Sequence, residues 1–131
     1  MKVLALDYGS ARTGVAVSDP TGTLARPVGV VERAGSGAGL TRLVELVEAE
    51  QPERIVVGLP LTLRGEHGAQ ARETEAFVAA LRARVSVPVE SFDERFTTAL
   101  AARSESSTPE DARAAAHLLE SYLHWSSSSD V

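Results

Sequence analysis

The order of its apolar segments is the feature that most constrains how this chain can fold. Three apolar stretches that read as strands come first, and two more follow that alternate with patterns of helical period. The expected strands cover residues 2–7, 14–19, 23–31, 54–58 and 85–92, and the expected helices cover residues 40–50, 71–84, 97–102 and 112–125. A three-stranded meander followed by alternating helices and strands predicts an α/β fold, with a mixed five-stranded sheet flanked by helices.

Turn-forming residues set the boundaries of these elements. Residues 8–13 predict a turn that joins the first two strands as a hairpin. Pro88 cannot donate to a neighbouring strand, which favours an edge position for the last strand. Thr108 and Pro109 have the residue types of a helix N-cap and first helical position, so they predict the start of the last helix.

Length and composition limit the classes of protein to consider. With 131 residues, the chain predicts a single domain over residues 1–125 and a disordered serine-rich tail over residues 126–131. The absence of cysteine excludes disulfides and thiolate metal sites, and the net charge of −5 argues against simple coating of nucleic acid. No apolar run approaches the roughly 18 residues of a membrane span, and Asp7 interrupts the first run too early for a signal peptide. We therefore expect a cytoplasmic protein with no membrane contact.

Three acidic residues are the strongest candidates for chemistry. Asp7 closes the first strand, Glu94 follows the last strand, and Asp111 falls in the first turn of the last helix. If both strands lie inside the sheet, these acids gather at one edge, where their mutual repulsion favours a bound divalent cation. Magnesium prefers oxygen ligands and retains water, which can attack a phosphodiester.

Each acid also has a structural interpretation that spacing alone leaves open. Asp7 could shape a hairpin turn. Asp93 and Glu94 could complement the dipole of a following helix. Asp111 lies three residues after Thr108 and could complete a capping box.

Four blocks of the sequence resemble the YqgF family, also called RuvX. They read LALDYGSARTGVAVSD at residues 4–19, IVVGLPL at 55–61, FDERFTT at 92–98 and DARAAAHLLESYL at 111–123. This family comprises Holliday junction resolvases, also described as pre-16S rRNA nucleases. The resemblance implies a ribonuclease H-like fold and hydrolysis of phosphodiester bonds in structured RNA or branched DNA with Mg²⁺ or Mn²⁺. Junction resolution by this family further implies a homodimer.

The resemblance also assigns site residues. Asp7, Glu94 and Asp111 match the family's catalytic, metal-binding acids. Arg12 and Arg95 match as well, and each could contact phosphate or form a structural ion pair.

Two further segments bear on substrate binding. Gly58 and Pro60, with the loop at residues 65–68, resemble a substrate-facing rim, although a strand end and a mobile loop explain them equally well. The segment at residues 101–107 is short and lacks lysine, whereas family members carry a longer, glycine- and lysine-rich segment there. This difference predicts weaker binding, another substrate, or a partner.

Two other functions stay open at this point. A catalytically inactive nuclease-like module that binds nucleic acid or assists ribosome assembly suits the acidic charge. The turn that follows Asp7 also resembles the phosphate turn of the sugar kinase, actin and Hsp70 superfamily, but those proteins need a second domain and a second glycine-rich loop. His117 and His124 share a helix face and favour a surface role over metal binding, and Trp125 favours burial over base stacking.

Overall fold

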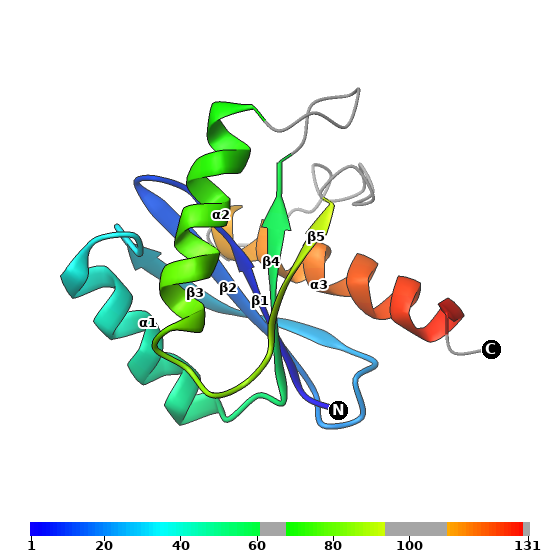
Figure 1. Ribbon diagram of the computed structural model, residues 1–131. Helices are drawn as coiled ribbons and strands as arrows, with labels where there is room; N and C mark the ends of the chain where they lie inside the picture. The colour runs from blue at the N-terminus through cyan, green and yellow to red at the C-terminus, as the bar shows by residue number, and fades with distance from the viewer. Residues whose placement is uncertain (61–67, 94–109, 130–131) are drawn as a thin grey trace.

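The computed structural model of the protein describes residues 1–60, 68–93 and 110–129, and in the last helix it describes the side chains from Ala112 to Trp125. Five strands and three helices make up this part of the chain (Figure 1). The strands are β1 (Val3–Asp7), β2 (Arg12–Ser18), β3 (Ala25–Glu32), β4 (Arg54–Leu59) and β5 (Val89–Asp93). The helices are α1 (Gly37–Glu50), α2 (Ala69–Arg82) and α3 (Glu110–Ser129).

The strands form one mixed sheet in the order β3-β2-β1-β4-β5. β1, β4 and β5 are parallel, whereas β2 is antiparallel to both β1 and β3. The predicted five-stranded mixed sheet is confirmed, and β5 is an edge strand as Pro88 predicts. Because β1, β4 and β5 all end at one edge of the sheet, and β2 begins and β3 ends there too, we call this the carboxyl edge.

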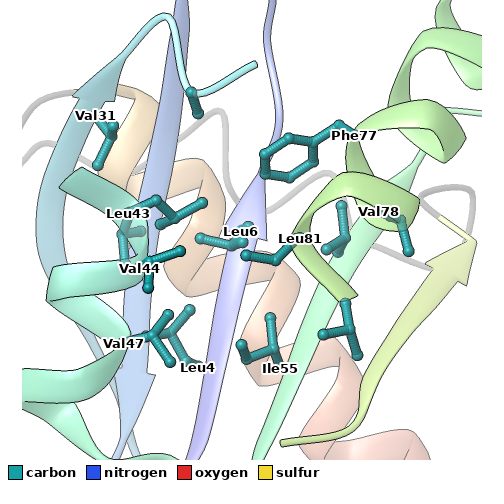
Figure 2. Close-up of a cluster of buried hydrophobic side chains, with 14 of the residues drawn as sticks. Leu4, Leu6, Val31, Leu43, Val44, Val47, Ile55, Phe77, Val78 and Leu81 are labelled. Atoms are coloured by element: carbon teal, nitrogen blue, oxygen red, sulfur yellow. The ribbon is translucent and has the colours of Figure 1, made fainter. Parts of the chain in front are cut away.

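Helices cover both faces of the sheet, and the alternation of side chains along β1 separates two cores. Leu4 and Leu6 point into a cluster with α1 and α2, shown in Figure 2. Val3 and Ala5 point to the other face, where they pack beneath α3. None of the helices that the structure describes is both long enough and apolar enough to cross a membrane.

The direction of α3 follows from the contacts of its C-terminal half. The hydroxyl of Tyr122 accepts a hydrogen bond from Arg54, with 2.8 Å between the Arg54 Nη1 and Tyr122 Oη atoms, and donates one to Glu90. Arg54 begins β4, so Tyr122 lies at the edge opposite the carboxyl edge. α3 therefore runs antiparallel to β1 and begins toward the carboxyl edge, behind the sheet in Figure 1.

The last strand and the last helix differ from their predicted bounds. β5 begins at Val89 rather than at residue 85, because the N–H group of Val85 still donates to the carbonyl of Leu81 at the end of α2. α3 continues to Ser129, into the segment predicted to be a disordered tail, since extending an existing helix costs less than nucleating one. The predicted helix at residues 97–102 and the start signals Thr108 and Pro109 lie outside the described residues.

Candidate active site at the carboxyl edge of the sheet

Asp7 is the last residue of the central strand and lies between two glycines. Its cross-strand partner on β2 is Gly14, and because Leu6 pairs with Val57, Asp7 lies level with Gly58 on β4. Val3 and Ala5 face α3, so strand alternation places the half-buried Asp7 side chain on that same face. Since glycine has no side chain, neither neighbouring strand fills the space beside the carboxylate at these positions.

The turn after Asp7 brings Arg12 to the same edge. A Cβ atom on Gly9 would lie 2.5 Å from the Arg12 carbonyl oxygen, so only glycine fits the turn. The Gly9 N–H group also donates to the hydroxyl of the buried Thr13, at 3.5 Å. Arg12 is exposed and is the first residue of β2, at the carboxyl edge. Because residues two apart in a strand share a face, Arg12 lies on the same face as Gly14, which is also the face of Asp7. The structure thus brings Asp7 and Arg12 to one edge and one face of the sheet.

Tyr8 fixes the end of β1 against α2, a role that the sequence analysis did not assign. Its ring stacks on Phe77 with 4.4 Å between ring centroids, and its hydroxyl donates to Glu73 Oε1 at 3.3 Å. Burial, followed by the nearby charge of Glu73 and the hydrogen bond to it, raises the pKa of Tyr8, which keeps the hydroxyl protonated as a donor. The alternation of side chains along the strand could have indicated this role. Tyr8 lies two residues after Leu6 and therefore on the same face, which α1 and α2 cover.

The ends of β4 and β5 complete the described part of the edge. Gly58 pairs with Phe92, and Leu59 pairs with Asp93. Phe92 packs beneath α3, so alternation directs Asp93 to the opposite face, away from that of Asp7. Pro60 follows β4 at this edge and is half-buried.

The first turn of α3 arrives near this edge. Asp111 is the second residue of α3, eleven residues before Tyr122, which corresponds to a rise of about 16 Å. Because α3 crosses the strands obliquely (Figure 1), only part of this rise runs along β1 toward the carboxyl edge. Ala112 is fully buried, in agreement with close packing of this turn.

Two of the three predicted metal ligands lie beyond the described side chains. Glu94 and Arg95 are outside the described residues, and of Asp111 only the backbone position is described. Among the side chains that the structure does describe, no three His, Cys, Asp or Glu groups gather as a metal site. The three-carboxylate cluster and its role therefore stay predictions.

The aromatic and histidine residues of α3 lie between its middle and its C-terminal end. His117 Nδ1 is 3.9 Å from Glu120 Oε2, and the exposed His124 lines a pocket with Leu24 near the β2–β3 turn. Trp125 remains 50% exposed while its ring centroid lies 5.8 Å from that of Phe92, so the predicted burial against the sheet is partial. Trp125 therefore lies beside Phe92, one residue before the end of β5, whereas His124 lies near the β2–β3 turn at the opposite edge.

Comparison with known proteins shows the family. The family model RuvX, described as Holliday junction resolvase, matches residues 1–125. A protein of Syntrophomonas wolfei is 38% identical over 132 residues, which cover 94% of each chain. A protein of Maridesulfovibrio salexigens is 42% identical over 105 residues, which cover 80% of this chain and 77% of the relative. Both relatives carry the name "Putative pre-16S rRNA nuclease".

Solved structures agree in fold. RuvC of T. thermophilus in complex with a Holliday junction substrate superimposes with a TM-score of 0.69 at 17% identity, over 98% of this chain and 96% of that chain. The Holliday junction resolvase of fowlpox virus gives a TM-score of 0.58 at 11% identity, over 95% of this chain and 99% of that chain. The fold is thus ribonuclease H-like, and the chain belongs to the RuvX family of nucleases.

Proposed function

We propose that this nuclease hydrolyses phosphodiester bonds in structured RNA or branched DNA at the carboxyl edge of its sheet, with a divalent metal ion bound by carboxylates. One observation carries the proposal: Asp7 ends the central strand between two glycines, on the face of the sheet that α3 covers. The names of the relatives and of the family supply the two substrates to test, which are pre-16S rRNA and the four-way DNA junction.

The residues at this edge fit Mg²⁺ or Mn²⁺. The Asp7 carboxylate offers the oxygen ligands that these hard cations prefer, and the glycines at positions 14 and 58 leave room beside it. In the proposal, Glu94 and Asp111 complete the ligand set. When bound, such an ion supplies an activated water and neutralises charge on the phosphate. The protein itself contributes two groups. One is the Asp7 carboxylate, which the central strand holds in place, and the other is the Arg12 guanidinium, whose planar shape matches two phosphate oxygens.

Strand alternation supports Glu94 over Asp93 as the second acid. Phe92 faces α3, and Asp93 therefore points toward the face that α1 and α2 cover. Asp7 lies on the α3 face, so Asp93 is on the wrong side of the sheet to share an ion with it. We thus expect Asp93→Asn to retain activity, whereas Glu94→Gln loses it.

For junction DNA the proposal includes a homodimer, because paired cuts in a symmetric junction require two sites related by a twofold axis. It also includes a cytoplasmic location, which the names of the relatives as pre-16S rRNA nucleases support. Light scattering of the protein with and without junction DNA measures the oligomeric state.

A cleavage assay with matched carboxylate variants tests the proposal. Wild-type protein with Mn²⁺ or Mg²⁺ is incubated with a four-way junction, a pre-16S rRNA fragment and a linear duplex of equal length. We expect Asp7→Asn, Glu94→Gln and Asp111→Asn each to lower the rate by about 100-fold or more, the order of effect seen when one transition-state contact is removed. Asp93→Asn is the control for loss of a charge at the same edge, and thermal melting checks that each variant is folded.

Two outcomes would contradict the proposal. Equal cleavage by wild type and Asp7→Asn would point to a contaminating nuclease or to another site. Cleavage that persists in excess chelator would exclude the metal ion. The preferred substrate follows from the relative rates on RNA and junction DNA.

A further inference from the structure

Arg33, directly after β3, has a backbone conformation that arginine rarely adopts. Its φ angle is +48°, and Arg33 and Gln51 are the only described non-glycine residues with positive φ. An L-residue in this left-handed region is strained because its Cβ approaches the following carbonyl, whereas glycine adopts it freely. A strained residue is retained only where its surroundings fix it, and such residues are concentrated at functional sites.

Three contacts fix the Arg33 backbone. Its N–H group donates to the carbonyl of Ala11 at 2.9 Å. Its carbonyl accepts from the N–H group of Ser36 at 2.9 Å and from the Ser36 hydroxyl at 2.7 Å. A Cβ atom on Gly39 would lie 1.8 Å from that same carbonyl oxygen, so α1 packs against Arg33 only because position 39 is glycine.

These contacts place Arg33 beside Arg12 at the carboxyl edge. Glu32, the last residue of β3, pairs with Arg12, the first residue of β2. The hydrogen bond from Arg33 to Ala11 therefore joins the two turns that carry the arginines. The Arg33 side chain is exposed, and within the part of the chain that the structure describes no carboxylate lies within ion-pair distance of its guanidinium.

We propose that Arg33 binds a second backbone phosphate of the nucleic-acid substrate, along the β3 side of the carboxyl edge. The inference rests on the proposed function. β3 lies two strands from β1. Asp7 pairs with Gly14, and Gly14 pairs with Val30, so Val30 lies at the level of Asp7 and Arg33 lies three residues beyond it. Strand spacing and rise put its Cα about 14 Å from that of Asp7, a separation of a few nucleotides along a strand. In a chain of net charge −5, an arginine free of described ion pairs at this edge supplies favourable charge where phosphates pass.

Substitution by glycine separates binding from folding. Arg33→Gly removes the guanidinium and also the left-handed strain, so its melting temperature is expected to equal or exceed that of wild type. Its KM for the cleaved substrate is expected to rise about 5- to 10-fold, with kcat within about twofold, because the contact forms equally in the bound and transition states. The slope of log affinity against log salt concentration is expected to fall by about one phosphate contact. Arg33→Lys should retain most of the salt slope.

Arg84 provides the matched control, because it is an exposed arginine after the end of α2, at the edge opposite the carboxyl edge. Arg84→Gln is expected to leave KM and salt slope within about twofold of wild type, as expected for a charge that touches no phosphate. An unchanged KM and salt slope in Arg33→Gly, or a change equal to that of Arg84→Gln, would overturn the inference. So would a lower melting temperature with a lower kcat, which is the result of a purely structural role.

Separate measurements of substrate binding and of substrate cleavage show whether this inference or the proposed function fails. If wild type cleaves and Arg33→Gly binds equally well, only the inference fails. If wild type binds junction or RNA through Arg33 without cutting either, the proposed function fails and the inference stands. Absence of any binding by wild type overturns both.

Discussion

Gly39 offers the sharpest test of how α1 is held against the carboxyl edge. A Cβ atom at this position would lie 1.8 Å from the Arg33 carbonyl oxygen and 2.8 Å from the Glu32 carbonyl oxygen, far inside the 3.4 Å at which ordinary contact begins. Both neighbours are backbone atoms, so no side-chain rotation can relieve the clash. In Gly39→Ala the start of α1 must move away from the end of β3.

The size of the effect follows from opposing terms. Overpacking in a tight interior costs about 1–3 kcal/mol and sometimes more, and a backbone clash falls at the upper end of that range. Displacing α1 also loosens the buried Leu43 and Val44, while the better helix propensity of alanine returns up to about 1 kcal/mol. We expect a net loss of about 2–4 kcal/mol in the free energy of unfolding. For a domain of this size that lowers the melting temperature by about 8–15 °C.

Gly37 is the matched control two residues earlier in the same helix. A Cβ atom there meets nothing within 4 Å, so Gly37→Ala should raise the free energy of unfolding by about 0.5 kcal/mol through helix propensity alone. Urea titration and calorimetry on both variants measure the two effects, with coincident transitions as the check for two-state unfolding. If Gly39→Ala is as stable as Gly37→Ala, the close approach of α1 to Arg33 is wrong, and the account of the strained arginine fails with it.

Two smaller changes probe other local contacts. Gln51 ends α1 with φ of +50°, so Gln51→Gly should stabilise the fold by about 0.5–1 kcal/mol in a thermal melt, and a loss would contradict the left-handed cap. The hydrogen bond from the N–H group of Leu24, helped by those from the threonines of the same turn, holds the pKa of Asp19 well below its ordinary value of 3.8. In acid, Asp19 therefore binds fewer protons in the native state than in the unfolded state. The stabilisation that the Asp19 carboxylate gives the fold is fully present above pH 3.8 and is lost as the pH falls through the pKa of Asp19 in the folded state. Asp19→Asn should be less stable at pH 6, with a shallower loss of stability from about pH 4 to pH 2 in urea titrations.

The mixed five-stranded sheet and the position of Asp7 at the end of the first strand could be predicted because each depends on a local pattern. A run of apolar residues that ends in an acid and a Tyr-Gly turn specifies a buried strand with a carboxylate at its end. The second half of the link predicted at residues 35–39 is instead the beginning of α1, because the Ser36 side chain accepts from the Gly39 N–H group at 3.1 Å and caps the helix. The sequence pattern did not reveal this helix start because its glycines interrupt the helical spacing of apolar residues. One of them, Gly39, is nevertheless required by the close packing of α1 against Arg33.

The contacts that define Arg33 and Tyr122 left no such signal. The role proposed for Arg33 depends on a backbone dihedral angle and on a hydrogen bond to Ala11, 22 positions earlier in the chain. Neither feature can be recognised from residue composition or from the periodicity of apolar residues. Tyr122 joins Arg54 and Glu90 from elements that are distant in the sequence, and these residue types are also common on exposed surfaces. Long-range polar pairing has to be seen in coordinates.

The central position of β1 explains why the candidate carboxylate belongs on this strand. An edge strand has one paired neighbour and can shift, whereas β1 is paired on both sides and covered on both faces. Its last residue is therefore firmly held, and Tyr8 anchors the chain immediately after it. Magnesium tolerates little displacement of a ligand, so a carboxylate on a firmly paired strand suits the metal site that we propose. In the proposed function, the phosphates of the substrate meet Arg12 and Arg33, which lie on the two turns at the β2 and β3 side of this edge.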